Sequence, residues 1–187
     1  FSASAQLFDV PEDPWSGNLA LGLGFPMTDL TEVTYTGYKP NLAVSAGIGL
    51  QLRNNLRLRG DLLAGFLNGN NANSYFQAEI FEGNLALEYN LISLLEENTN
   101  FKLNLVAGAG AGLLNSNRFD INTRQRIAEV PSPPGSIYSY QVHGLGGVNV
   151  MIPIQKSLDL TLGYVQRVVI DQPWIDGLES GEATDMY

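Results

Sequence analysis

The sequence predicts an all-β protein: an eight-stranded antiparallel up-and-down transmembrane β-barrel, with the eighth strand following residue 187. Apolar residues alternate with small or polar ones at a period of two through most of the chain, which is typical of strands whose two faces meet different surroundings. Charged residues make up only 16% of the sequence, whereas ordinary soluble domains have about 25%. Glycine is frequent, with 20 residues, and no apolar run reaches the ~18 residues that a transmembrane helix needs.

Residues 101–113 show the alternation most clearly. One face of this stretch carries Phe, Leu and Ala, and the other is mostly glycine. Small residues fit the narrow interior of a small barrel, so we expect the glycine face to point inward and the aliphatic face outward. The same division predicts seven strands, at residues 17–26, 41–53, 56–67, 75–91, 101–113, 138–153 and 158–169.

The chain is interpreted as one barrel domain, residues 17–187, after an irregular lead-in over residues 1–16. The lead-in is predicted to be irregular because it contains Pro11 and Pro14. Its first five residues include Ala-Ser-Ala, which resembles the small-residue end of a secretory signal peptide. Residues 1–5 are therefore either the remnant of a signal peptide or an ordinary small-residue tail.

The connections between the predicted strands differ in length in a regular way. We expect polar and mostly long linkers after the first, third, fifth and seventh strands and short connections after the others, including residues 92–100 after the fourth. Residues 115–136, which contain a proline cluster, are predicted to be the longest irregular loop, and residues 171–187 also read as loop. Bacterial outer-membrane barrels alternate long external loops with short periplasmic turns and have even strand numbers, so seven strands imply an eighth beyond Tyr187.

Charged residues of both signs lie on the small-residue face of the predicted strands. Because a lone buried charge is costly, we expect these side chains to pair inside the barrel. A soluble barrel that lines a pocket with its apolar face is the alternative, but the few charged residues favour the membrane barrel. The predicted interior charge network consists of Arg57, Arg59, Asp61, Glu82, Glu88, Lys102, Asp159 and Arg167.

Composition excludes several classes of function. The net charge is −9, from 10 Lys plus Arg and 19 Asp plus Glu, and no basic stripe is present to neutralise the phosphates of a nucleic acid. The absence of cysteine excludes disulfides, thiolate metal ligands and a cysteine nucleophile. With a single histidine as well, we expect no metal site and no cofactor.

The candidate chemistry is sparse. His143 is the single histidine, and a lipid-modifying enzyme would need it beside a nucleophile. Ser139 shares its face of the strand but lies ~13 Å away, too far for a hydrogen bond. We therefore expect His143 to be an inward histidine in a polar network, and no catalytic residue. Arg118, Arg124 and Arg126, in the predicted long loop, are candidates for contact with lipopolysaccharide phosphates or an acidic partner.

Four segments carry a resemblance to a known family: Leu56–Asn70, Phe81–Asn90, Val106–Gly112 and residues 171–187. Together they resemble the OmpA-type eight-stranded outer-membrane barrels, in the variety common in Bacteroidota that includes PorG-like barrels associated with type IX secretion. The resemblance covers about residues 17–187. It implies location in a bacterial outer membrane and a final strand directly after the last loop.

These observations lead us to expect a non-enzymatic outer-membrane barrel that acts as a membrane anchor or as a structural or assembly subunit of a cell-envelope complex. An eight-stranded interior is filled by side chains, so we expect no wide pore. The expected partners are outer-membrane lipid or lipopolysaccharide and proteins of the complex, and no nucleic acid. Three alternatives remain open: a type IX secretion-associated barrel, an outer-leaflet lipid-modifying enzyme that uses His143, and a soluble lipocalin-like carrier.

Overall fold

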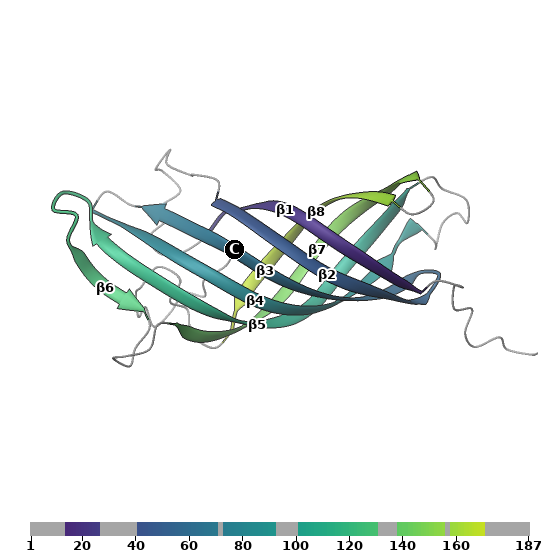
Figure 1. The fold of residues 1–187 in the computed structure, drawn as a ribbon, viewed down its shortest axis with the longest axis horizontal. Coiled ribbons are helices and arrows are strands. Elements are labelled where there is room, and N and C mark those ends of the chain that lie inside the picture. Colours follow the sequence, from purple (N-terminus) through teal and green to yellow (C-terminus); the bar gives the residue numbers. More distant parts are fainter. Residues whose placement is uncertain are drawn as a thin grey trace, which may run out of the picture.

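The computed structural model describes residues 14–26, 41–70, 73–92, 101–130, 138–155 and 158–170. These residues form one antiparallel up-and-down sheet that curls into a partial barrel (Figure 1), which confirms the all-β prediction. No helix in the described ranges is long and apolar enough to cross a membrane. The strands are β1 (Trp15–Gly24), β2 (Asn41–Arg53), β3 (Leu56–Asn70), β4 (Ser74–Asn90), β5 (Lys102–Asp120), β6 (Arg126–Val130), β7 (Ser139–Gln155) and β8 (Leu158–Val169).

The order of pairing is β1-β2-β3-β4-β5-β7-β8, and the short β6 pairs with β5 beside this path. Within the described residues, β1 and β8 are the two edges of the sheet. Six antiparallel steps separate them, so they run in the same direction. One strand antiparallel to both edges therefore fits between them. The eighth barrel strand expected after residue 187 lies outside the described residues and stays a prediction.

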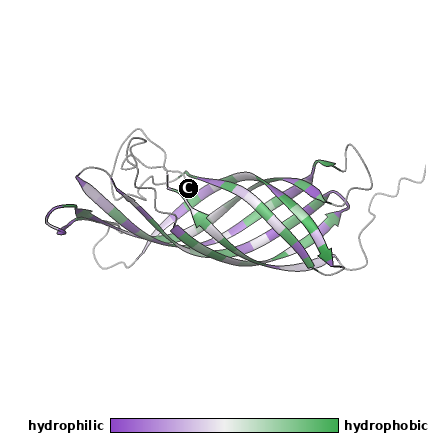
Figure 2. Ribbon diagram, turned by 90° about the horizontal axis from the view of Figure 1, so that it is seen from above, coloured by the Kyte–Doolittle hydropathy of each residue, from purple (hydrophilic) through white to green (hydrophobic). Residues whose placement is uncertain are grey.

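The two faces of the sheet follow the predicted division. Residues paired in register share a face, and along β4 every second residue from Ser74 to Glu88 is buried. The residues between them point outward, so that Leu85 is 58% exposed whereas Glu82 is 0% exposed. Around Glu82 and Leu85 the interior of the curled sheet thus receives charged and small residues, and the outside receives aliphatic ones. Figure 2 shows hydrophobic residues interspersed with small and hydrophilic ones along the strands.

The expected long linker after β3 is wrong. Only residues 71–73 separate β3 from β4, because the hairpin continues its ladder to the Asn70–Tyr75 pair. β4 ends at Asn90 and β5 begins at Lys102, so the connection between them agrees to within one residue at each end with the predicted connection at residues 92–100. The turn at Asn54–Asn55 between β2 and β3 lies where the sequence predicts it.

The prediction of an irregular loop at residues 115–136 is also wrong for residues 115–120 and 126–130, which form strands. β5 continues to Asp120, and β6 returns beside it with Ser116 opposite Val130. β7 pairs with β5 as far as Leu114, opposite Ser139, so β6 takes over the same edge of β5 where β7 ends. As a second partner strand, β6 provides hydrogen-bond partners for the backbone N–H and C=O groups at the end of β5, which keeps this segment extended. Residues 131–136 of this loop, the predicted loop at residues 171–187 and residues 1–13 of the lead-in lie outside the described residues. The lead-in is predicted to extend to residue 16, but β1 begins at Trp15.

Candidate functional site

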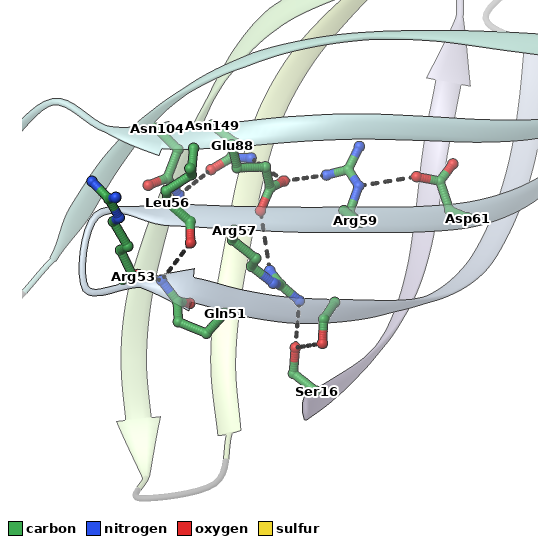
Figure 3. A network of polar contacts seen from close by, with 11 residues as sticks. Ser16, Gln51, Arg53, Leu56, Arg57, Arg59, Asp61, Glu88, Asn104 and Asn149 are labelled. Carbon is green, nitrogen blue, oxygen red and sulfur yellow. Dashed lines mark hydrogen bonds and ion pairs between the residues drawn. The ribbon is translucent and has the colours of Figure 1, made fainter. Parts of the chain in front are cut away.

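A network of polar side chains fills one part of the barrel interior (Figure 3). Its centre is Glu88 of β4, whose side chain is only 2% exposed. The Glu88 carboxylate accepts hydrogen bonds from Arg57, with 3.1 Å between Nη1 and Oε2, and from Arg59. It also accepts one from the amide of Asn149 of β7, with 3.0 Å between Nδ2 and Oε1. Three donors therefore surround one buried carboxylate, which is what a buried charge needs.

The strand alternation of β3 explains why these groups meet. Arg57, Arg59 and Asp61 are two residues apart and therefore lie on the same, inward face. Arg57 is directly opposite Glu88 in the ladder between β3 and β4. The Arg59 guanidinium reaches both carboxylates, and its Nε lies 2.9 Å from Oδ1 of Asp61. The Arg57 guanidinium also donates to Oγ of Ser16, which ties β3 to β1 at 2.7 Å.

A second cluster lies further along the interior, around Glu82 of β4. The Nε of Arg167 of β8 is 3.1 Å from Oε2 of Glu82, and this carboxylate is fully buried. Gln141 of β7 donates to Oε1 of Glu82 at 3.3 Å. The two clusters are joined by Asn84, whose Nδ2 donates to Oδ2 of Asp61 at 3.1 Å.

His143 belongs to the second cluster and is 0% exposed. Its Nε2 is 2.7 Å from Oδ1 of Asn84. Since the amide nitrogen of Asn84 already donates to Asp61, the oxygen faces His143, and we assign the ring hydrogen to Nε2 on that basis. The same nitrogen lies 3.8 Å from Oε2 of Glu82, beyond hydrogen-bond distance. His143 is thus a histidine of the interior network, as the sequence predicts.

Glycine residues on neighbouring strands leave the room that the network occupies. A Cβ atom on Gly49 would overlap the guanidinium of Arg57. A Cβ atom on Gly110 would overlap both the amide oxygen of Asn84 and the imidazole ring of His143. This explains in part why the inward face of β5 is so rich in glycine: the long side chains of β4 and β7 reach across it.

Six of the eight residues predicted for the interior charge network come together in these two clusters. Lys102 and Asp159 do not join them, and both are exposed. Within the described residues neither takes part in an ion pair. The reason is their position, because each lies in the first two residues of its strand, opposite Met151 and Pro153 near the end of β7. Both residues have the parity of the inward face, but their place at the start of a strand puts them at the end of the barrel, away from the two clusters.

Sequence reasoning missed the amide side chains of the network. Asn84, Asn149 and Gln141 connect charged groups, and the Nδ2 of Asn104 donates to Oδ1 of Asn149 at 2.7 Å. Neutral amides are common in turns and carry no charge that calls for a partner. The available signal was their position, since Asn84 and Asn104 share the parity of the predicted charges of their strands, and Gln141 and Asn149 share the parity of His143.

The three arginine residues proposed for partner contact are not together on an irregular loop. Arg118 lies on β5 and donates to Oγ of Ser74 from both Nε and Nη2, at 3.1 and 2.9 Å. Arg126 begins β6 and donates to Oδ1 of Asn117 at 3.4 Å. Arg124 lies in the turn between these strands with a φ of 55°, in the left-handed region. Contact of these residues with a partner stays a prediction.

The described residues do not contain a group of three or more His, Asp or Glu side chains arranged to hold a metal ion. The chain matches no protein-family model and no curated protein. The arrangement of the site therefore carries the functional argument alone. Chemically, it holds buried opposite charges against one another and links β1, β3, β4, β7 and β8 through side chains.

A hydrophobic cluster lies beyond the second polar cluster in the barrel interior. Val169 of β8 packs there against residues of β3, β4 and β5, so the sheet is curled enough for distant strands to share one core. Side chains of the polar network and of this cluster both lie in the interior, and the interior of an eight-stranded barrel is just wide enough for side chains. The members of the cluster are Leu63, Leu67, Phe76, Ala78, Ile80, Leu114 and Val169.

Proposed function

We propose that this chain is a non-enzymatic outer-membrane β-barrel, a membrane anchor or structural or assembly subunit of a cell-envelope complex. The observation that carries the proposal is the chemistry of the outer face. Along β1, β2, β7 and β8 the outward positions hold aliphatic residues, glycine, Trp or Tyr, with Gln166 as the one polar exception among the described residues. Many of these side chains are more than half exposed, including Leu19 at 86% and Leu162 at 60%.

An exposed apolar surface of this extent is unfavourable in water. Soluble monomers seldom expose a contiguous apolar patch larger than a few hundred Å², whereas a membrane barrel needs an apolar band around its outside. The interior supports the same proposal, because its charges are paired and hydrogen-bonded with one another. A carrier of the lipocalin kind has the reverse arrangement, with an apolar interior throughout and a charged exterior.

Membrane fractionation of the complete natural protein tests this proposal. We expect the protein to stay with outer-membrane fragments through an alkaline carbonate wash and to be released only by detergent. Recovery in the aqueous phase without detergent would overturn the membrane proposal and favour the soluble carrier.

The side chains that lie in the interior and the burial of His143 support an anchoring or assembly role over transport or catalysis, because the interior of an eight-stranded barrel is just wide enough for side chains. We expect the purified protein to give no steady conductance in planar lipid bilayers. We also expect His143→Ala to leave the lipid A composition of the host unchanged. An altered lipid profile in that variant would instead support the outer-leaflet enzyme.

The envelope complex itself is tested by the size of the protein in mild detergent. We expect it to migrate on native gels in an assembly larger than one chain, held with other envelope proteins. Migration as a single chain in its micelle would contradict the assembly role and leave only the anchor. A secretion-associated barrel is one form of the assembly role, and loss of type IX cargo on deletion of the gene would support it.

A further inference from the structure

Both faces of β4 change polarity at the same point along the strand. From Phe81 to Tyr89 the outward residues are apolar or glycine, and the inward residues include Glu82 and Glu88. On the other side of that point the outward residues are Gln77 and Glu79, both exposed. The inward residues there are Phe76, Ala78 and Ile80, all at most 5% exposed. The strand therefore exchanges its polar and apolar faces between Glu79 and Glu82.

The outward face of the neighbouring strands changes at the same level. On β5 the outward positions pass from Leu113 to Asn115 and Asn117, while the inward positions pass from glycine to the buried Leu114 and then to the buried Ser116. On β3 the outward positions pass from Phe66 to Asn68. In the sequence each exchange is marked by two adjacent apolar residues, one for each face. Two of these doublets, Ile80–Phe81 and Leu113–Leu114, lie directly opposite each other in the ladder.

The part of the sheet beyond the exchange is built like a water-soluble structure. We call it the projecting sheet, and it consists of residues 67–70 of β3, 74–80 of β4, 114–120 of β5 and all of β6. It forms one end of the molecule (Figure 1) and contains hydrophilic residues (Figure 2), of which Gln77, Glu79 and Asn115 lie on the outward face. Tyr75 and Phe119 stack on its outer face with their ring centroids 5.0 Å apart. Ser74 and Arg118 hydrogen-bond on its inner face.

Opposite surroundings explain the exchange. A sheet in water turns its apolar face to the interior, whereas a sheet in lipid turns its apolar face outward. The length of the outward apolar stretch agrees with this. It covers eleven residues on β3, from Leu56 to Phe66, and nine on β4, from Phe81 to Tyr89. A strand that crosses a bilayer at a tilt needs about 9–11 residues.

We propose that the hydrocarbon interior of a lipid bilayer contacts this barrel only as far as Phe66, Phe81 and Leu113, and that the projecting sheet stands in water beyond that line. This inference rests on the proposed membrane location and adds its boundary on one side. The lipid-facing surface then ends between residues that are two positions apart on the same face of one strand. On β4 these are Phe81 and Glu79, and on β5 they are Leu113 and Asn115.

The absence of cysteine from the sequence makes a direct test possible. Single-cysteine variants Leu85→Cys, Phe81→Cys, Glu79→Cys and Gln77→Cys are labelled with a bimane fluorophore and reconstituted into phosphatidylcholine vesicles. Quenching is measured with brominated acyl chains and, separately, with aqueous iodide. We expect brominated lipid to quench the probes at residues 85 and 81 severalfold more than those at 79 and 77, and iodide to give the reverse order.

The possible outcomes separate the boundary from the membrane location itself. Strong lipid quenching at residues 77 and 79 as well would overturn the boundary while supporting membrane embedding. Iodide quenching at all four positions would overturn both the boundary and the proposed membrane location. If a β4 variant fails to fold, Leu113→Cys and Asn117→Cys on β5 provide the same comparison, with lipid quenching expected at residue 113 alone.

Discussion

Glu82 of β4 and Arg167 of β8 meet across the interior of the barrel, with 3.1 Å between Oε2 and Nε. Their strands are not neighbours, because β5 and β7 lie between them in the sheet. The carboxylate is 0% exposed and the guanidinium side chain 15% exposed. The pair therefore forms only when the sheet is curled, and it connects one edge strand to the middle of the sheet.

Removing one member of this pair should destabilise the barrel strongly. We expect Glu82→Gln and Arg167→Leu each to lower the free energy of unfolding by about 3–5 kcal/mol, because each leaves the other partner buried without its counter-charge. The double variant should lose clearly less than the sum of the two. Equilibrium unfolding in urea, with the protein in lipid vesicles, measures these values. Strictly additive losses would show that the two groups do not interact.

Substitution of Glu88 should destabilise the barrel at least as strongly, because the Glu88 carboxylate accepts hydrogen bonds from three donors. Glu88→Leu leaves Arg57 and Arg59 without this carboxylate, and we expect a lower unfolding temperature and a loss of about 3–5 kcal/mol. Lys102→Ala is the matched control, since Lys102 is exposed and lies outside the network. Its effect should remain within about 0.5 kcal/mol. An unchanged unfolding temperature in Glu88→Leu would mean that the pairing described here does not stabilise the barrel.

Gly110 tests whether glycine is required for space. An added methyl group would meet the Asn84 amide and the His143 ring, so Gly110→Ala should cost about 1–3 kcal/mol, as overpacking does. Gly22→Ala provides the control, because a Cβ atom on Gly22 would meet no atom within 4 Å. The urea midpoint of unfolding is measured for both variants and for the parent protein, and we expect a lower midpoint for Gly110→Ala than for Gly22→Ala. Equal midpoints for the two variants would contradict a packed network at Gly110.

A charged residue on the outer face should destabilise the barrel only where that face contacts lipid. Leu85→Arg places a cation on the outer face near the middle of the apolar stretch of β4, which costs about 2–4 kcal/mol in a bilayer. Gln77→Arg makes the same change on the same strand in the projecting sheet and should alter stability by no more than about 0.5 kcal/mol. Unfolding in vesicles measures both. If Leu85→Arg were as mild as Gln77→Arg, the outer face would not be in lipid.

Much of this fold is readable from the sequence because period-two alternation assigns both a strand and a face. β2 and β8 lie at the predicted residues, and the residues of β3 and β4 predicted for the interior charge network point inward as expected. Local pattern does not determine which distant groups meet. The Glu82–Arg167 contact depends on the register of three ladders and on the curl of the whole sheet.

The end of β5 was missed for a different physical reason. At Leu113–Leu114 the alternation changes phase, because the polar and apolar faces exchange there. A pattern with a fixed apolar face therefore ends at that doublet, although the strand continues for six more residues to Asp120. Asn115 and Asn117 then resemble loop residues, since their role is to face water on the outside of a continuing strand.

The turn between β5 and β6 depends on one carboxylate and should respond to pH. Asp120 Oδ1 accepts hydrogen bonds from the backbone nitrogen atoms of Thr123 and Asn122, at 2.8 and 2.9 Å, and from the Thr123 hydroxyl. These bonds hold the pKa of Asp120 below its usual 3.8, and the bond from the Thr123 backbone has the largest effect. The carboxylate therefore stabilises the turn fully above that usual value, and the contribution is lost as the pH falls through the lower folded-state pKa.

We expect Asp120→Asn to weaken the turn at neutral pH, so that the backbone amides of Asn122 and Thr123 exchange hydrogen faster than in the parent protein. Lowering the pH from 7 to 3 should shift the Thr123 amide resonance in the parent and leave it nearly fixed in the variant. Glu79→Gln is the control, because Glu79 lies on the same outer face of the projecting sheet and away from this turn. A pH-dependent shift of equal size in Asp120→Asn would mean that another group controls the turn.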